Sequence, residues 1–196
     1  MNTNTITGIL LAGGKSKRMG TEKGMIPLGE CMLYQYPLRV LESFTDTILI
    51  STCKPLEIPE KYEQVCDEIP GIGPMGGLYT CLKQSQSELN MVLPYDLPMV
   101  NSDLFRHLLR YTNDFDVVIP AAEPGKQEPL CGIYKKSALT AMKEMIDEEN
   151  YAIHQLLPRV RSRVLVMDPS LPFYHEMLFS NVNTQADLAG ILPMMR

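Results

Sequence analysis

The stretch Ile9-Leu10-Leu11-Ala12-Gly13-Gly14-Lys15-Ser16-Lys17-Arg18-Met19-Gly20, followed shortly by Lys23, decides the fold of this chain. Its apolar first part predicts a buried strand, which runs into a loop with adjacent glycines, a serine and several cations. Glycines let successive backbone N–H groups approach an anion, and lysine and arginine neutralise its charge. The loop therefore predicts a phosphate-binding site, although the P-loop spacing Gly-x-x-x-x-Gly-Lys-Ser/Thr does not occur in it.

The composition is that of a globular protein without a nucleic-acid-binding surface. The 196 residues predict a single domain, residues 1–196, and the net charge of −5 provides no basic field for a nucleic-acid backbone. No apolar run approaches the ~20 residues of a membrane span, and the polar start, residues 1–5, does not resemble a signal peptide. The five cysteines are widely spaced and form no Cys-x-x-Cys pair. We therefore expect reduced thiols and a cytoplasmic protein.

Strand and helix patterns alternate along the chain, which is typical of a parallel sheet built from βαβ units. Periodicity predicts strands at 6–12, 47–51, 62–66, 90–95, 116–120 and 164–167, with an extended segment at 23–28. It predicts helices at 32–43, 78–84, 137–149, 152–157 and 185–192, and a further helix capped by Ser102 and Asp103. Thr184 and Asp187 have the spacing of a capping box. The fold class is thus α/β with a mostly parallel central sheet.

Two acidic residues follow predicted strands. Asp67 follows the strand at 62–66, and Asp96 follows the strand at 90–95. In such sheets, ligands bind where the carboxyl ends of the strands emerge. Mg²⁺ is usually held by one or two carboxylates together with substrate phosphates, so Asp96 is the candidate metal ligand. A structural turn is the alternative interpretation of Asp96.

A second glycine-rich segment, Gly71-x-Gly73-x-x-Gly76, formally matches a dinucleotide-binding fingerprint. The fingerprint should open a helix directly after a strand, whereas residues 67–70 intervene here. A nicotinamide-dependent oxidoreductase is therefore a minor alternative. A tight loop before a helix explains the segment equally simply.

The glycine loop also carries a family resemblance. The string Leu-Ala-Gly-Gly-x-Ser-x-Arg-Met-Gly-x-x-Lys, residues 11–23, resembles the signature of nucleotidyltransferases with a Rossmann-like fold. The Ala-Gly-Gly sequence within it is similar to the corresponding sequence of the molybdenum cofactor guanylyltransferases. The strings Gly-Pro-x-x-Gly-Leu at 73–78 and Asn-Val-Asn-Thr-x-x-Asp-Leu at 181–188 resemble the same family, and cytidylyl relatives more often carry Asp-Ile-Asp-Thr at the latter place.

The resemblance implies a three-layer nucleotidyltransferase fold and transfer of GMP from GTP to the terminal phosphate of molybdopterin or Mo-molybdopterin, with release of pyrophosphate. It implies Mg²⁺ as cofactor and, as further partners, the maturation proteins of molybdoenzymes. The implied catalytic residues are Arg18, Lys23, Asp96 and Asn183. The implied nucleotide-binding residues are Leu11, Ala12, Gly13, Gly14, Lys23, Ser51, Asp67 and Asp96, although family members often have asparagine where Ser51 stands.

The roles of several polar residues, and the exact reaction, each allow more than one interpretation. Gln127 or Glu128 could contact the acceptor, or could lie at the exposed tip of a β-hairpin. The alternating Arg159, Arg161 and Arg163 could line an anionic acceptor, or could belong to a solvated edge strand. A cytidylyl or sugar-phosphate nucleotidyltransferase has the same glycine loop, and a non-catalytic carrier of GTP or cofactor is a more distant possibility.

Overall fold

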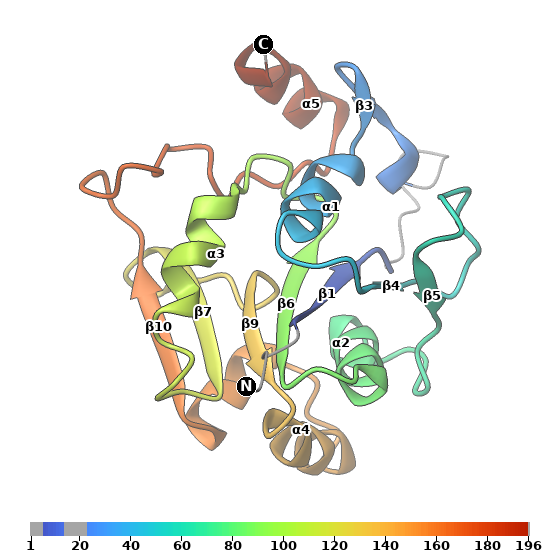
Figure 1. The fold of residues 1–196 in the computed structure, drawn as a ribbon, viewed down its shortest axis with the longest axis vertical. Coiled ribbons are helices and arrows are strands. Elements are labelled where there is room, and N and C mark those ends of the chain that lie inside the picture. Colours follow the sequence, from blue (N-terminus) through green and yellow to red (C-terminus); the bar gives the residue numbers. More distant parts are fainter. Residues whose placement is uncertain (1–5, 14–22, 196) are drawn as a thin grey trace.

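The computed structural model describes residues 6–13 and 23–195, which form a sheet of eight strands with helices on both faces (Figure 1). The side chains of Lys23 and Met195 are not described. In chain order the elements are β1 Ile6–Leu11, η1 Lys23–Met25, β2 Pro27–Leu28, β3 Cys31–Met32, α1 Gln35–Glu42, β4 Ile48–Ser51, β5 Glu63–Val65, α2 Pro74–Gln84, β6 Leu89–Pro94, α3 Ser102–Leu109, β7 Val117–Glu123, β8 Lys126–Gln127, β9 Gly132–Lys135, α4 Ala138–Asp147, η2 Ile153–Arg159, β10 Ser162–Val166, α5 Gln185–Ile191 and η3 Leu192–Met195.

The strands of the main sheet lie in the order β10-β7-β9-β6-β1-β4-β5, and β8 pairs with β7. β1 lies between β4 and β6 and is parallel to both. β9 lies antiparallel between β6 and β7, so the strands on either side of it run in the same direction. The mostly parallel α/β sheet predicted from the sequence is confirmed.

The apolar strands are buried on both faces because helices cover the sheet from both sides. Leu10 of β1 packs in a cluster that also contains Leu38 of α1 and Phe105 of α3. Its neighbours Ile9 and Leu11 pack in a second cluster, with residues of α2 and α4 such as Leu78. Successive side chains of a strand point to opposite faces, so the continuous apolar run of β1 supplies both cores. The arrangement has three layers.

Helix α2 begins earlier than the periodicity predicted, at Pro74 instead of Leu78. Gly73, which precedes it, has a positive φ of 66°, a conformation that side-chain-bearing residues rarely adopt. Proline at the first helical position lacks the N–H that would be unsatisfied there and already has a helical φ. The prolines and glycines that suggested a long loop therefore start the helix.

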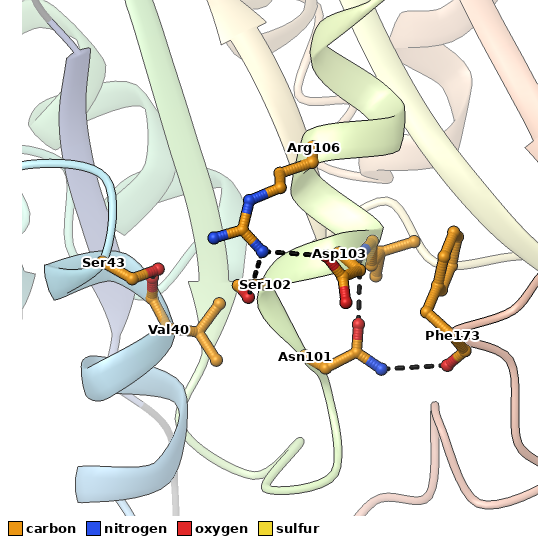
Figure 2. A network of polar contacts seen from close by, with 8 residues as sticks. Val40, Ser43, Asn101, Ser102, Asp103, Arg106 and Phe173 are labelled. Atoms are coloured by element: carbon orange, nitrogen blue, oxygen red, sulfur yellow. Dashed lines mark hydrogen bonds and ion pairs between the residues drawn. The ribbon is translucent and has the colours of Figure 1, made fainter.

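The N-cap of α3 is also corrected by the structure. The side chain of Asn101, not of Ser102 or Asp103, accepts the hydrogen bond from the backbone N–H of Leu104 at 3.1 Å. The same amide donates to the carbonyl oxygen of Phe173 at 3.0 Å, which ties the chain after β10 to this helix (Figure 2). Ser102 and Asp103 instead accept hydrogen bonds from Arg106.

Other boundaries differ by a few residues. Lys23–Met25 is a 3₁₀ turn and not an extended segment, and α1 begins at Gln35. The predicted capping box is present in full, because Thr184 and Asp187 exchange side-chain-to-backbone hydrogen bonds. Within residues 6–13 and 23–195, no helix combines the length and the apolar character that crossing a membrane requires.

Candidate active site

The carboxyl ends of four neighbouring strands, β6, β1, β4 and β5, meet at one edge of the sheet. Leu11, the last residue of β1, is in register with Ser51 of β4 and with Pro94 of β6. The backbone continues this contact beyond the strands: Ala12 N–H donates to the carbonyl of Ser51 at 3.0 Å. The first residues of the glycine loop therefore lie directly beside Ser51, as predicted for a strand-end site.

Ser51 and Asp67 come together on one side of the glycine loop. Ser51 is in register with Val65 of β5, and its hydroxyl donates a long hydrogen bond of 3.4 Å to Oδ1 of Asp67. Burial raises the pKa of the Asp67 carboxyl above its ordinary value, and the Ser51 hydroxyl opposes this rise. Gly13 lies next to the same serine: a Cβ at Gly13 would be 3.8 Å from the Ser51 carbonyl oxygen.

The first turn of α2 approaches Ser51 and Asp67 so closely that only glycine fits. A Cβ at Gly77 would lie 2.2 Å from Oγ of Ser51 and 3.2 Å from Oδ1 of Asp67. The amino-terminal end of a helix carries a partial positive charge, which favours a carboxylate beside it. The sequence analysis included Gly77 in the Gly-Pro-x-x-Gly-Leu string but did not name it as a candidate site residue. The adjacent glycines of the Gly-Pro loop were its only signal.

A disulfide between Cys53 and Cys66 joins the ends of β4 and β5. This corrects the expectation that the cysteines are all reduced thiols. The reason is topological: Ser51 and Val65 pair in the sheet, so the residues that follow them emerge side by side. A usable signal existed in the sequence, since Cys53 closely follows one predicted strand and Cys66 ends the next. The strand order that makes them neighbours is not encoded locally.

Asp96 and Asn183 come together on the other side of the glycine loop. The carbonyl oxygen of Asp96 accepts a hydrogen bond from the backbone N–H of Val182 at 2.9 Å. Asn183, which is exposed, follows Val182 and therefore lies beside Asp96, two residues beyond the end of β6. The backbone N–H of Asn183 donates to Asp187 at 2.7 Å, so the capping box of α5 also holds this segment. The predicted pairing of these two residues in one site is consistent with this geometry.

Glu128 lies on the same side as Asp96. It follows β8, and its backbone N–H donates to the carbonyl oxygen of Pro120 at 3.0 Å. Burial raises the pKa of the Glu128 carboxyl, Lys126 lowers it, and repulsion by Asp96 raises it further. The two acidic side chains therefore share one electrostatic environment. The hairpin interpretation of this segment is also correct, because β8 pairs antiparallel with β7.

The alternating arginines lie at the opposite end of the sheet. Ser162, between Arg161 and Arg163, is in register with Val117, and Val117 pairs through Tyr134 with the start of β6. Arg159 is paired with Glu148, and Arg161 with Asp116. This position contradicts an acceptor-binding row at the strand-end site. The edge-strand interpretation holds for Arg163, whereas Arg159 ends η2 and Arg161 precedes β10.

Some predicted site residues fall outside the part of the chain that the structure describes. Gly14 and Arg18 belong to residues 14–22, which are not described. The backbone of Lys23 begins η1. A magnesium ion is compatible with the described residues: Asp96 supplies one carboxylate, Glu128 adds negative charge beside it, and substrate phosphates complete such sites. Within the described ranges, no three His, Cys, Asp or Glu side chains form a metal-binding group, so a protein-only metal cage is not present there.

An α/β sheet with a glycine loop and acidic residues at its strand ends is the arrangement expected of a nucleotide-binding enzyme. Ala12 and Gly13, at the start of that loop, lie between Ser51 and the strand that leads to Asp96. Comparison with known proteins supports this class and narrows it. The chain belongs to the family described as MobA-like NTP transferase domain, whose model matches residues 8–164. Members of this family are nucleotidyltransferases, and this chain is one.

Relatives match over nearly the whole chain. A probable molybdenum cofactor guanylyltransferase of Flavobacterium johnsoniae is 30% identical over 94% of this chain and 95% of its own length. A protein of the same name from Carboxydothermus hydrogenoformans is 31% identical over 95% of both. A solved structure of molybdopterin-guanine dinucleotide biosynthesis protein A from Archaeoglobus fulgidus has a TM-score of 0.79 at 24% identity, covering 96% of this chain and 98% of that one. At that identity the structural likeness shows the fold.

Proposed function

We propose that this protein transfers GMP from GTP to the terminal phosphate of molybdopterin or its molybdenum form and releases pyrophosphate. The observation that carries the proposal is the similarity, at 30% identity and over nearly the full length of both chains, to relatives named molybdenum cofactor guanylyltransferases. The strand-end geometry supports it, because the polar residues expected from the sequence lie on either side of one glycine loop.

The reaction is a displacement at phosphorus. An oxygen of the acceptor phosphate attacks the α-phosphorus of GTP, the bond to the oxygen that bridges to the β-phosphate breaks, and pyrophosphate leaves with that oxygen. The acceptor is already a nucleophile, so the protein contributes mainly positioning and charge stabilisation.

We assign the two sides of the loop to the two substrates. On one side, Ser51 and Asp67 would contact the base and ribose of GTP, and the backbone N–H groups of Gly13 and Gly14 would hold its phosphates. The Ala12 N–H, which the sequence also suggested, is instead donated to the Ser51 carbonyl oxygen. On the other side, Asp96 would hold Mg²⁺, and Asn183 would lie near the ion or the acceptor phosphate. When bound, Mg²⁺ would neutralise charge on the phosphate oxygens. Arg18 and Lys23 would offset the charge of the departing pyrophosphate.

The cellular setting completes the proposal. We place the protein in the cytoplasm and expect maturation proteins of molybdoenzymes to receive its product. Support comes from the family membership and from the nature of the product, a cofactor that apo-enzymes take up.

The test is pyrophosphate release with molybdopterin, Mg²⁺ and each of the four nucleoside triphosphates in turn. We expect release with GTP alone, and only when molybdopterin is present. Release with CTP in place of GTP would instead assign the chain to the cytidylyltransferases, one of which, from Thermus thermophilus, has a solved structure with this fold at 14% identity. No release with any nucleotide would refute the guanylyltransferase proposal. A molybdopterin-free mixture measures hydrolysis and serves as the control.

A further inference from the structure

The disulfide between Cys53 and Cys66 lies at the strand ends that carry Ser51 and Asp67. Cys53 follows Ser51 by two residues, and Cys66 directly precedes Asp67. The backbone N–H of Asp67 donates to Sγ of Cys53 at 3.1 Å. One sulfur atom of the disulfide therefore contacts the residue whose carboxylate accepts from the Ser51 hydroxyl. A change in the bond between these sulfurs acts directly on the position of Asp67.

The strand that the disulfide secures is short and lies at the edge of the sheet. β5 has three residues and pairs only with β4 in the part of the chain that the structure describes. Val65 is its only buried residue, while the buried Tyr62 precedes it and the side chain of Gln64 exchanges hydrogen bonds with the backbone of Leu56. Opening the disulfide leaves Asp67 at the end of a short edge strand. The fold itself remains supported, because Thr80 of α2 still accepts a hydrogen bond from the backbone N–H of Glu68 at 3.0 Å.

The disulfide is also accessible to a thiol reductant. Cys53 and Cys66 are both exposed. Cys81 and Cys131 are buried free thiols, and burial raises the pKa of both, to about 12 for Cys81. A buried thiol with a raised pKa is inert, whereas an exposed disulfide can be attacked. Disulfides of cytosolic proteins are usually transient and often sense the redox state, which fits the compartment proposed above.

We propose that Cys53 and Cys66 form a reversible redox site that controls nucleotide affinity: the disulfide form binds GTP tightly and the dithiol form binds it weakly. The inference rests on the proposed function, since it takes Ser51 and Asp67 as nucleotide contacts. The disulfide holds these residues in place before the ligand arrives, so binding costs less ordering entropy. Reduction removes this preorganisation.

The chemistry balances with a dithiol as co-reactant. A thiolate of the dithiol attacks one protein sulfur and forms a mixed disulfide, and the other protein cysteine leaves as a thiolate and takes up a proton. The second thiol of the reductant, as its thiolate, then displaces the remaining protein cysteine, which leaves in the same way. Two electrons and two protons pass to the protein, and the reductant becomes a cyclic disulfide. Oxidation by a disulfide of this kind reverses the steps.

Thermodynamic linkage makes the effect reciprocal. If the disulfide form binds GTP more tightly, bound GTP must make the disulfide harder to reduce by the same factor. Couplings between sites typically change affinity by about 5-fold to 150-fold. A tenfold difference in affinity corresponds to about 30 mV in the reduction potential of this two-electron couple.

The experiment measures GTP binding to the wild-type protein with Mg²⁺ and no acceptor, before and after treatment with dithiothreitol, with thiols counted in both states. With thiols counted after denaturation, we expect three in the oxidised protein, matching the free cysteines Cys31, Cys81 and Cys131, and five after reduction. We expect the dissociation constant for GTP to rise by at least about fivefold on reduction. Re-oxidation with oxidised glutathione, which is converted to two reduced molecules as the protein disulfide forms, should restore it.

Variants separate this site from the other thiols. Cys53→Ser should bind GTP like the reduced wild type under both conditions, and Cys31→Ser should keep the full redox response. Chemical reduction of the wild type gives the same information if Cys53→Ser does not fold. Five thiols that oxidised glutathione cannot convert to three would overturn the inference, as would equal GTP affinity in both states. GTP binding in neither state would instead refute the proposed function.

Discussion

Replacing Gly77 with alanine tests the contact between α2 and the nucleotide side of the site. The added Cβ would lie 2.2 Å from Oγ of Ser51, which is 0.8 Å inside the 3.0 Å limit that real Cβ contacts respect. Ser51 is only 2% exposed, so its side chain has little room to move away. We expect the hydroxyl to rotate and lose its hydrogen bond to Asp67, or the first turn of α2 to shift.

The magnitude follows from two opposing effects. Overpacking a filled site costs about 1–3 kcal/mol, and the severity of this clash places it near about 3. Alanine is favoured over glycine inside a helix by about 1 kcal/mol. We therefore expect Gly77→Ala to lower the free energy of unfolding by about 2 kcal/mol, measured by urea denaturation with fitted m-values. The dissociation constant for GTP should rise at least about tenfold, because Ser51 and Asp67 are displaced together.

Two matched variants isolate the clash. A Cβ at Gly190 in α5 meets nothing within 4 Å, so Gly190→Ala should keep only the helix-propensity gain of up to about 1 kcal/mol. The double variant Ser51→Ala/Gly77→Ala removes the oxygen at 2.2 Å and should recover more than half of the lost stability. Equal stabilities for Gly77→Ala and Gly190→Ala, or no recovery in the double variant, would refute the reasoning about this contact.

Three further predictions concern the charged residues. Asp96→Ala and Lys23→Ala should each lower turnover by at least about a hundredfold, with unfolding curves close to wild type; near-normal rates in a pyrophosphate-release assay would remove the assigned role. Burial raises the pKa of Asp67 in the folded protein, so its contribution to stability is fully present below its ordinary pKa and is lost as the pH rises through the folded value. Asp67→Asn should therefore be at least as stable as wild type at pH 7 and lose GTP affinity, and urea titrations from pH 3 to pH 7 should show its relative stability increasing with pH. Arg161→Ala breaks a surface pair with Asp116 at the far end of the sheet, so steady-state rates should stay unchanged; a rise in KM for the acceptor would contradict its placement.

Family membership explains why the candidate site residues could be named from short strings. The glycine loop after the first strand, Asp96 after β6 and the segment around Asn183 are each recognisable within about ten residues. Their convergence also follows from general rules, because parallel strands place their carboxyl ends at one edge of a sheet. The acceptor role considered for the arginines is excluded by the same rule, because they lie at the opposite edge of the sheet. Nothing in residues 159–163 tells which end of the sheet they occupy.

The sequence by itself determined the elements and their order, because buried strands, amphipathic helices and caps are encoded over a few neighbouring residues. Ile9 to Leu11, the capping box of Thr184 and Asp187, and the strand-end position of Asp96 are of this kind. Only the tertiary structure decided that Cys53 forms a disulfide with Cys66 and that Gly77 packs too close to Ser51 for a Cβ atom. Those contacts depend on the order and register of strands far apart in the chain, and that order is set by packing of the whole sheet, which no local pattern specifies.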